Sequence, residues 1–248
     1  NAQLSTFVLS SMVANALADA GVSPDHVGGH SLGEYSALAA GGWVESGPAA
    51  RLVAARGVAM RQAAVANVGT MAAIIGLEVD AVVAVCDDVD GHVWVANDNA
   101  PGQVVIAGSA TAIEAAGELA RERGARRPMP RNVAGAFQTP YMAPAQEGLD
   151  AALAKTDFRT GSATPWANVD AAAHSQPTEW PGLLAAQLCS PVRWRTQVAA
   201  MAAAGVDTFV EVGPGTVLSG MVKRIAPEAR RLSAATPDDV SSVAQNLR

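Results

Sequence analysis

The stretch that decides the fold is His-Val-Gly-Gly-His-Ser-Leu-Gly-Glu, residues 26–34, in which Ser31 stands in a Gly-x-Ser-x-Gly pattern. The sequence predicts a short strand over 26–29 and a helix over 34–40, so the serine falls on the sharp turn between them. Such a turn leaves little room for Cβ atoms, and Gly29 and Gly33 meet that need. The pattern therefore predicts a nucleophile elbow, a turn that presents a serine hydroxyl at the start of a helix.

The elbow also predicts a place for negative charge. Unpaired N–H groups at the start of a helix stabilise a developing oxyanion, and the backbone N–H of Leu32 is the expected donor. The alternative is a surface serine in a glycine-rich turn. A chain with 23 glycines can contain the Gly-x-Ser-x-Gly pattern by chance.

Composition limits the classes of function. Half of the 248 residues are hydrophobic and 16% are charged, which favours a soluble globular protein. A net charge of −6 argues against nucleic acid as a partner. Two widely separated cysteines make a zinc site or a disulfide framework unlikely, and the absence of a long apolar run argues against a membrane span or a signal peptide. We therefore expect a cytoplasmic protein with no metal and no bound cofactor.

The order of the predicted elements indicates an α/β protein. Residues 68–132 carry a β-α-β-β-α-β order, which is the ferredoxin-like arrangement, and they are predicted to form an inserted subdomain. The core would comprise 1–67 and 133–248. In the subdomain we expect strands at 71–77, 92–96, 103–108 and 125–132, helices at 79–88 and 110–124, and a turn at 97–102. In the core we expect further helices at 3–20, 46–66, 139–155, 178–188, 191–204 and 216–225, and further strands at 163–168, 208–212 and 231–234.

Several motifs together resemble one known family, the malonyl-CoA:acyl carrier protein transacylases and the acyltransferase domains of fatty acid and polyketide synthases. They occur in the family's order along most of the chain. The motifs are GHSLGEYSALAAGG (29–42), RLVAARG (51–57), MAAIIG (71–76), NAPGQVVIAG (99–108), SPVRW (190–194) and EVGPG (211–215). The resemblance implies an α/β-hydrolase-like core with an inserted ferredoxin-like subdomain.

The resemblance also implies roles for individual residues. Ser31 matches the nucleophile that carries the malonyl group as an ester, and Arg56 matches the arginine that pairs with the free malonyl carboxylate. A guanidinium suits that role because its planar fork binds a carboxylate through two hydrogen bonds. Without the resemblance, Arg56 reads as part of a solvated helix face. Ser190 lies where a backbone carbonyl of the family orients the catalytic histidine.

Four further residues are assigned to substrate binding or acyl choice. Leu32 and Phe137, the latter in GAFQ (135–138), resemble the malonyl-selecting versions of their motifs. A smaller residue at 137 would open room for an α-methyl group, a difference worth only about 1–3 kcal/mol. Met60 and His30 are placed in the same substrate-binding set, although His30 is expected to point away from Ser31 and to serve the packing.

One departure from the family concerns the base. The family places its catalytic histidine directly after the Phe137 position, where this chain has Gln138. An amide forms hydrogen bonds but cannot take the serine proton near neutral pH. None of the four histidines, His26, His30, His92 and His174, occupies that position. Three explanations are open: an engineered substitution, which we favour, a natural homologue without catalysis, or altered chemistry.

The second departure concerns the start of the chain. The family begins with a strand leading into a Gly-Gln-Gly loop that supplies another oxyanion donor, and nothing here matches that segment, so we expect an absent N-terminal piece.

Three functions compete at this point. The first is malonyl transfer from coenzyme A to an acyl carrier protein, by a monomer or a part of a larger synthase. The second is a catalytically silent module that binds carrier protein or acyl-CoA, which Gln138 favours. The third, an esterase, is disfavoured by Arg56.

Overall fold

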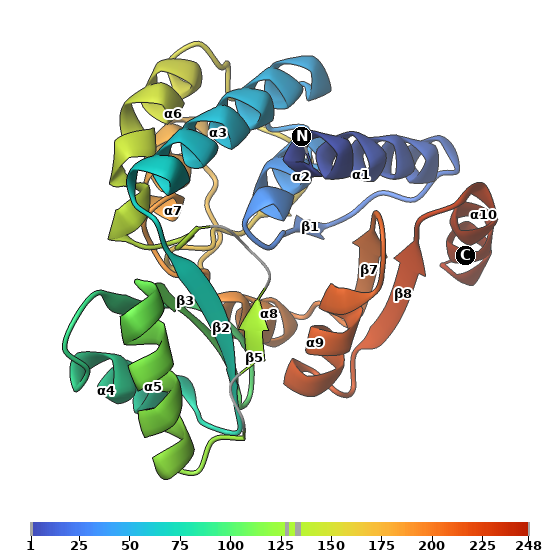
Figure 1. The fold of residues 1–248 in the computed structure, drawn as a ribbon. Coiled ribbons are helices and arrows are strands. Elements are labelled where there is room, and N and C mark those ends of the chain that lie inside the picture. Colours follow the sequence, from blue (N-terminus) through green and yellow to red (C-terminus); the bar gives the residue numbers. More distant parts are fainter. Residues whose placement is uncertain (1, 127–128, 132–134, 248) are drawn as a thin grey trace.

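Helices and strands are interspersed along the chain (Figure 1), and the computed structural model describes residues 2–126, 129–131 and 135–247. The α-helices are α1 Ala2–Asp19, α2 Leu32–Ala40, α3 Ser46–Ala66, α4 Val79–Asp87, α5 Ala110–Glu122, α6 Gln146–Leu153, α7 Trp180–Gln187, α8 Trp194–Ala203, α9 Val217–Ile225 and α10 Pro237–Asn246. Two 3₁₀ helices, η1 Pro140–Ala145 and η2 Pro177–Glu179, precede α6 and α7. The strands are β1 His26–Val27, β2 Thr70–Ile75, β3 Val93–Ala100, β4 Gln103–Gly108, β5 Met129–Arg131, β6 Thr164–Pro165, β7 Thr208–Val212 and β8 Arg230–Ala234.

The described strands form three small sheets. Two of them are parallel pairs, β1 with β6 and β7 with β8. The third has four antiparallel strands in the order β3-β4-β2-β5, built by the segment β2-α4-β3-β4-α5-β5. Because parallel strands need a crossover, α9 connects β7 to β8, whereas β1 and β6 are separated in sequence by the whole four-stranded unit.

The four-stranded sheet is buried on both faces. Alternate residues of a strand point to opposite faces, so Ala72 and Ile74 of β2 pack against α4 and α5. Met71 of β2 faces the other way, into a cluster with Ala136 and Phe137. This second face therefore supports the segment that carries two of the predicted site residues.

The predicted turn over 97–102 is wrong for its first four residues. Strand β3 continues to Ala100, and only Pro101 and Gly102 form the turn. Asn97 pairs with Val192 in an isolated bridge, and the Asp98 carboxylate accepts hydrogen bonds from Arg195 at 2.9 and 3.0 Å. Asparagine and aspartate favour turns when their side chains bond locally, whereas here the partners come from distant segments. These contacts join the four-stranded unit to the rest of the molecule.

Helix α3 has the predicted bounds, and it packs with α2, α6 and α7 around the largest apolar cluster. Leu52 and Val53 of α3 are buried with Trp180 of α7 and Leu149 of α6. Arg51 and Arg61 are exposed, whereas Arg56 is 1% exposed. Arg56 therefore does not share a face with the other two arginines, because five residues turn a helix by well over one full turn.

Several predicted bounds need correction. The helix predicted over 139–155 is divided into η1 and α6, because Pro144 lies inside this segment and lacks the N–H of a regular helix. The helix predicted from 191 begins at Trp194, since Val192 pairs with β3. The strand predicted over 163–168 is only two residues long, and of the strand predicted over 125–132, residues 127, 128 and 132 lie outside the described residues.

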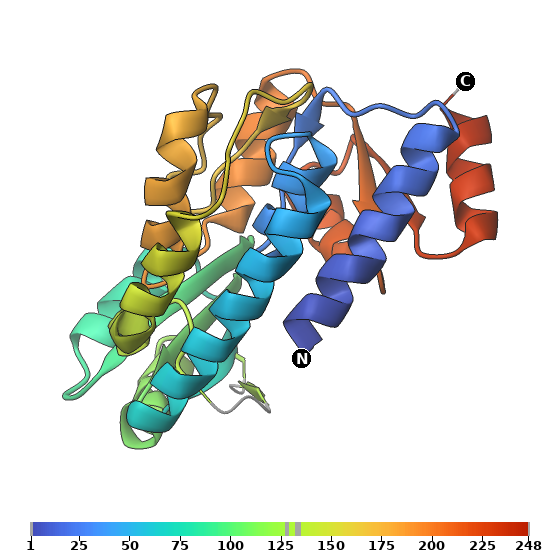
Figure 2. The ribbon, with the colours of Figure 1, turned by 90° about the horizontal axis from the view of Figure 1, so that it is seen from above.

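Helix α10 was not predicted, although its start carries a clear signal. The Thr236 hydroxyl accepts from the N–H of Asp239, whose carboxylate accepts the N–H of Thr236. This reciprocal pattern caps a helix N-terminus. Figure 2 shows α10 beside α1, where Val13 and Leu17 meet Val240 and Val243.

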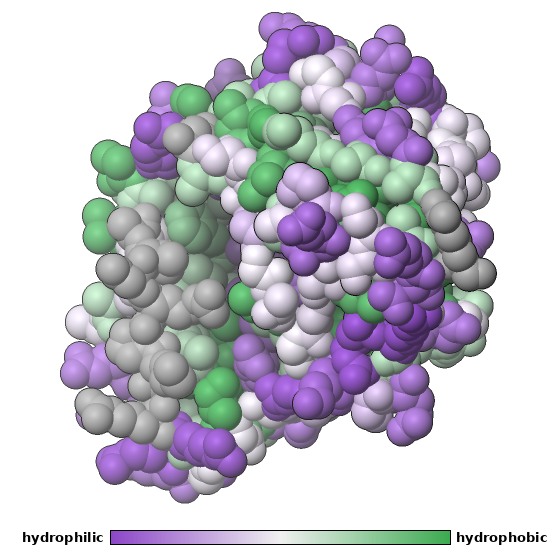
Figure 3. Space-filling view, turned by 90° about the vertical axis from the view of Figure 1, so that its right-hand side faces the viewer, coloured by the Kyte–Doolittle hydropathy of each residue, from purple (hydrophilic) through white to green (hydrophobic). Residues whose placement is uncertain are grey.

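Figure 3 shows the face that carries α10 and β8, where hydrophilic side chains surround apolar patches and a hollow lies toward the left side. No helix within the described residues combines the length and the apolar character needed to cross a membrane.

Candidate active site

The elbow at Ser31 has the predicted geometry. Ser31 lies between β1 and α2 with φ 54° and ψ −102°, a conformation that costs a non-glycine residue free energy. A Cβ on Gly29 would lie 2.0 Å from the backbone carbon and oxygen of Gly33, so Gly29 is required. The prediction for Gly33 is wrong, because a Cβ there would meet open space in the first turn of α2.

Asn168 holds the elbow in this conformation. Its Oδ1 accepts the Ser31 N–H at 2.8 Å, and its Nδ2 donates to the Gly29 carbonyl at 2.7 Å. The same Nδ2 donates to Gln197 Oε1 at 2.9 Å, and the Asn168 side chain is fully buried. Sequence reasoning missed this residue, and its signal was an amide side chain at the end of the predicted strand 163–168.

The Leu32 N–H begins helix α2 directly after Ser31. The next two N–H groups, of Gly33 and Glu34, donate to the carbonyls of His30 and Ser31 at 2.9 and 3.2 Å. Within the described part of the chain, no hydrogen bond uses the Leu32 N–H. The donor role of Leu32 stays a prediction.

Arg56 lies beside the nucleophile. Its Nη2 donates to Ser31 Oγ at 3.1 Å and to Gln187 Oε1 at 3.0 Å, and its Nη1 donates to Gln3 Oε1 at 2.7 Å. The guanidinium also lies 5.3 Å from the Tyr35 ring centroid. The reading of Arg56 as part of a solvated face is therefore wrong. No carboxylate among the described residues forms an ion pair with it.

Gln138 contacts the nucleophile from another side. It is buried at the positive φ of 55°, and its Nε2 donates to Ser31 Oγ at 2.9 Å. Ser31 Oγ thus accepts from Gln138 and from Arg56, and neither group takes up a proton near neutral pH. The hydroxyl is well positioned, yet neither of these partners is a base.

The histidines are occupied elsewhere, with one exception. His26 accepts from the Trp166 indole, His92 stacks on Trp94, and His174 contacts two carboxylates. His30 hydrogen-bonds Asn99 Oδ1 through Nε2 at 2.8 Å and meets the Trp194 ring edge to face. It has the packing role predicted for it, and it also lines the cavity in front of Ser31.

One cavity of about 210 Å³ brings the candidates together. It is lined by Gln3, His30, Ser31, Leu32, Arg56, Met60, Phe137 and Gln138. Seven of the eight predicted site residues are in this set, and Gln3 is the addition. Ser190 is the exception: it lies half-buried in the bend after α7, and the described contacts include no hydrogen bond between it and Gln138.

A family model for the acyl transferase domain matches residues 1–238. The chain belongs to the acyl transferase domain family. It is 39% identical to the malonyl CoA-acyl carrier protein transacylase of Bacillus subtilis over 100% of this chain and 79% of that protein. It is 42% identical to the Haemophilus influenzae protein of the same name, over 89% of this chain and 70% of that one.

Solved structures agree with this membership. An acyl carrier protein S-malonyltransferase from Vibrio cholerae matches this acyl transferase domain with a TM-score of 0.93 and 38% identity, over 98% of this chain and 80% of that one. A malonyl-transacylase solved in complex with its type II PKS acyl-carrier protein matches with a TM-score of 0.95 and 33% identity, over 99% and 80%. The fold is thus the mixed α/β fold of these enzymes.

A buried carboxyl lies behind the nucleophile of this acyl transferase domain. Glu34, on α2, is 1% exposed, and its Oε1 accepts the Asn168 N–H at 3.1 Å. Its Oε2 accepts from Gln187 Nε2, which also donates to the Ser31 carbonyl at 2.9 Å. Burial raises the pKa of Glu34 to about 8, against the lowering effects of these hydrogen bonds and of Arg56. Sequence reasoning missed both Glu34 and Gln187.

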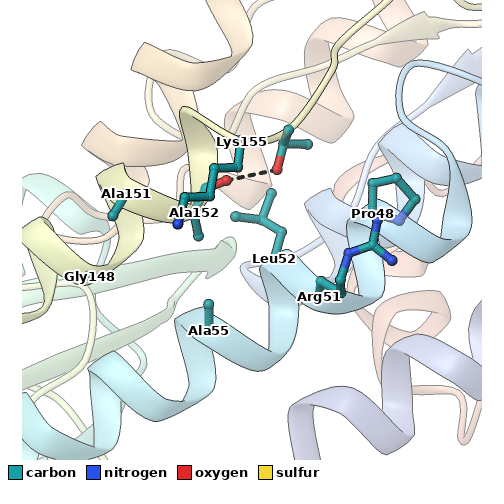
Figure 4. Close-up of a pocket in the computed structure, with 9 residues that line it drawn as sticks. Pro48, Arg51, Leu52, Ala55, Gly148, Ala151, Ala152 and Lys155 are labelled. Atoms are coloured by element: carbon teal, nitrogen blue, oxygen red, sulfur yellow. Dashed lines mark hydrogen bonds between the residues drawn. The ribbon is translucent and has the colours of Figure 1, made fainter.

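A larger cavity of about 350 Å³ lies between α3 and α6, with Arg51 and Lys155 at its edges (Figure 4). The Thr156 hydroxyl there donates to the Ala152 carbonyl at 2.9 Å. The described residues that line this cavity include no acid or histidine, so the smaller cavity at Ser31 is the better candidate for chemistry in the acyl transferase domain. In the part of the chain that is described, no cluster of three or more His, Cys, Asp and Glu side chains is arranged to hold a metal ion.

Proposed function

We propose that this chain transfers a malonyl group from coenzyme A, through an ester on Ser31, to the phosphopantetheine thiol of an acyl carrier protein. The observation that carries the proposal is the buried Arg56 guanidinium 3.1 Å from Ser31 Oγ. A buried cation without an ion-pair partner beside a nucleophile favours an acyl group that ends in a carboxylate. The names of the relatives and the complex with a carrier protein support the same reaction.

In the first step Ser31 Oγ attacks the thioester carbonyl of malonyl-CoA, and the carbonyl oxygen becomes an oxyanion that the Leu32 N–H stabilises. The C–S bond then breaks, the proton lost by Ser31 passes through solvent to the leaving sulfur, and coenzyme A leaves as its thiol while the malonyl ester remains on Ser31. The carrier-protein thiol attacks this ester in the second step and restores the hydroxyl. Arg56 holds the malonyl carboxylate in both steps. Met60 and Phe137 form the walls around the acyl group, and Ser190 serves to orient the residue at 138.

We expect Gln138 to make both acyl-transfer steps slow. Because the amide takes no proton from Ser31, the hydroxyl is a weak nucleophile, and both transfer steps are slow. The acyl-transfer chemistry draws on no resident cofactor. The two unpaired cysteines, Cys86 and Cys189, support a reducing cytoplasmic location.

We also propose the division of the fold. An α/β-hydrolase-like core would comprise 1–67 and 133–248, and a ferredoxin-like subdomain would comprise 68–132. The antiparallel order β3-β4-β2-β5 with α4 and α5 on one face supports the second assignment. The strand–elbow–helix unit β1-Ser31-α2 supports the first. The boundary at 132 and 133 lies outside the described residues.

A second candidate is a silent module that binds malonyl-CoA or carrier protein without transfer, and Gln138 favours it. Intact-mass spectrometry after incubation with malonyl-CoA separates the two functions. Transfer predicts a gain of one malonyl group in the chain and no gain in its Ser31→Ala variant. A chain that binds malonyl-CoA but gains no mass over hours would support the silent module.

Phe137 offers a test of acyl choice. It packs against the second face of the four-stranded sheet and lines the cavity at Ser31. We expect Phe137→Ala to raise methylmalonyl loading relative to malonyl loading by about 10–100-fold, since one methyl group in an apolar pocket is worth about 1–3 kcal/mol. Competition between the two acyl-CoA substrates, read by mass, measures the ratio. An unchanged ratio would remove Phe137 from acyl selection.

A further inference from the structure

Among the residues that the structure describes, Arg56 has no ion-pair partner in the cavity. Its guanidinium is 1% exposed and its three hydrogen bonds go to Gln3, Gln187 and Ser31, all neutral groups. Its Nε has no hydrogen-bond partner among the described residues. A buried cation is costly without a nearby negative charge, so an ionised carboxyl close to Arg56 would stabilise it.

Gln187 links Arg56 to the nearest buried carboxyl. Its Oε1 accepts from Arg56 Nη2 at 3.0 Å, while its Nε2 donates to Glu34 Oε2 and to the Ser31 carbonyl. The hydrogen-bonding groups of the Gln187 amide are thus all used. In the flipped orientation the amide nitrogen would face the Arg56 donor and the amide oxygen would face the Glu34 oxygen, so neither bond could form. This arrangement couples the charge on Glu34 to the charge on Arg56.

The groups around Glu34 have opposing effects on whether it is protonated or ionised. Burial favours the neutral acid, whereas the donors Gln187 and Asn168 and the charge of Arg56 on α3 favour the carboxylate. Asp170, in the turn after β6, opposes the carboxylate, and Tyr35 on α2 is a neutral neighbour whose own pKa burial raises to about 12. The result is a pKa for Glu34 of about 8 in the empty site. A change in the charge of the cavity therefore changes the protonation of Glu34.

We propose that the Glu34 carboxylate, when ionised, is the internal counter-charge of Arg56, linked to it through the Gln187 amide, and that it takes up a proton when the carboxylate of an acyl substrate pairs with Arg56. The inference rests on the proposed function, because it takes a malonyl carboxylate as the ligand of Arg56. The proton comes from solvent and binds a Glu34 carboxylate oxygen. The substrate anion then replaces the Glu34 carboxylate as the partner of the guanidinium.

The direction of the pH dependence follows from this exchange. Below about pH 7 Glu34 is already protonated in the empty site, so substrate binding takes up little proton. Above pH 8 the empty site holds the carboxylate, and the substrate's charge raises the pKa of Glu34 further, so binding must take up a proton. The affinity for malonyl-CoA therefore falls above pH 8, by up to about tenfold for each pH unit.

Calorimetry of malonyl-CoA binding, in pairs of buffers with different ionisation enthalpies, tests the inference. A Ser31→Ala background prevents ester formation. We expect proton uptake near zero at about pH 6 and approaching one proton per bound malonyl-CoA at about pH 9. Adding Glu34→Gln is expected to abolish the uptake and to flatten the pH dependence. Glu114→Gln, an exposed acid on α5, is the matched control and should change neither.

Two further arms keep the outcomes distinct. Acetyl-CoA lacks the carboxylate, so its binding should cause no proton uptake. Infrared difference spectra of the Ser31→Ala protein should gain a protonated-carboxyl band when malonyl-CoA binds. This measurement does not depend on whether Glu34→Gln folds. Malonyl-CoA binding without proton uptake at high pH would overturn the inference and leave the proposed function intact. No binding of malonyl-CoA at any pH would overturn the proposed function itself.

Discussion

Replacing Gln138 with histidine is expected to raise the rate of malonyl loading by about 10²–10⁴-fold, the usual contribution of a positioned general base. Gln138 Nε2 already lies 2.9 Å from Ser31 Oγ, within the reach that a base requires. Histidine is among the residues that tolerate a positive φ, so the backbone at 55° should accept it. The substitution supplies the one group that the site lacks for proton transfer.

Single-turnover loading by malonyl-CoA, followed by quenched mass spectrometry, measures this gain. The rate of Gln138→His should rise with pH through the histidine pKa, ordinarily about 6.5, whereas the Gln138 form should show no such step. Gln138→Asn is the control, since it changes the amide's reach without adding a base. Equal rates for Gln138 and Gln138→His would mean that another group takes the Ser31 proton.

Arg56→Ala is expected to lower malonyl loading by about a hundredfold or more while acetyl loading changes much less. Two charge-assisted hydrogen bonds to a carboxylate, at about 1.5–3 kcal/mol each, are lost only for the substrate that carries that carboxylate. Both substrates lose the Arg56 contact to Ser31 Oγ, so the ratio of the two loading rates isolates the carboxylate.

The ratio of malonyl to acetyl loading is measured in one series with Arg51→Ala, an exposed arginine of the same helix, as the control. Arg56→Ala also leaves the Oε1 atoms of Gln3 and Gln187 without their donor, at a cost of about 1–3 kcal/mol each, so the thermal unfolding of the variant should be measured beside its kinetics. An equal loss for both acyl groups would refute the carboxylate contact of Arg56.

The sequence predicts the parts of the site whose signal is local. Neighbours along the chain predict three features: the need for Gly29 before Ser31, the helix that starts after Ser31, and the bounds of α3. The resemblance adds Arg56, Met60, Phe137 and Gln138, and the cavity contains all four.

The residues that hold these groups in place were not predicted, because their partners are far away in sequence. Asn168 lies 137 residues from Ser31, and Gln187 lies 131 residues from Arg56. Gln3 contacts Arg56 across 53 residues. Glu34 looks like an ordinary acid in the first turn of a helix, where a negative charge is stabilised in solvent. Only the packing of α2 against α7 and the Asn168 turn reveals that it is buried.

The errors in the predicted elements have the same origin. Asp98 and Asn99 read as a turn because such side chains usually bond to their own backbone, yet here Arg195 and His30 are their partners. The motif predicts that Gly33 is essential, but α2 determines where a Cβ at this position would point. A Cβ there would meet no other atom within 4 Å.

Peptide mapping of the protein after incubation with malonyl-CoA tests the central claim most directly. Digestion at low pH keeps an oxygen ester intact and locates the added mass. The account predicts one malonyl group, on the peptide that contains Ser31, formed slowly with Gln138 and rapidly with Gln138→His. A label on another peptide, or no label in either form, would contradict it.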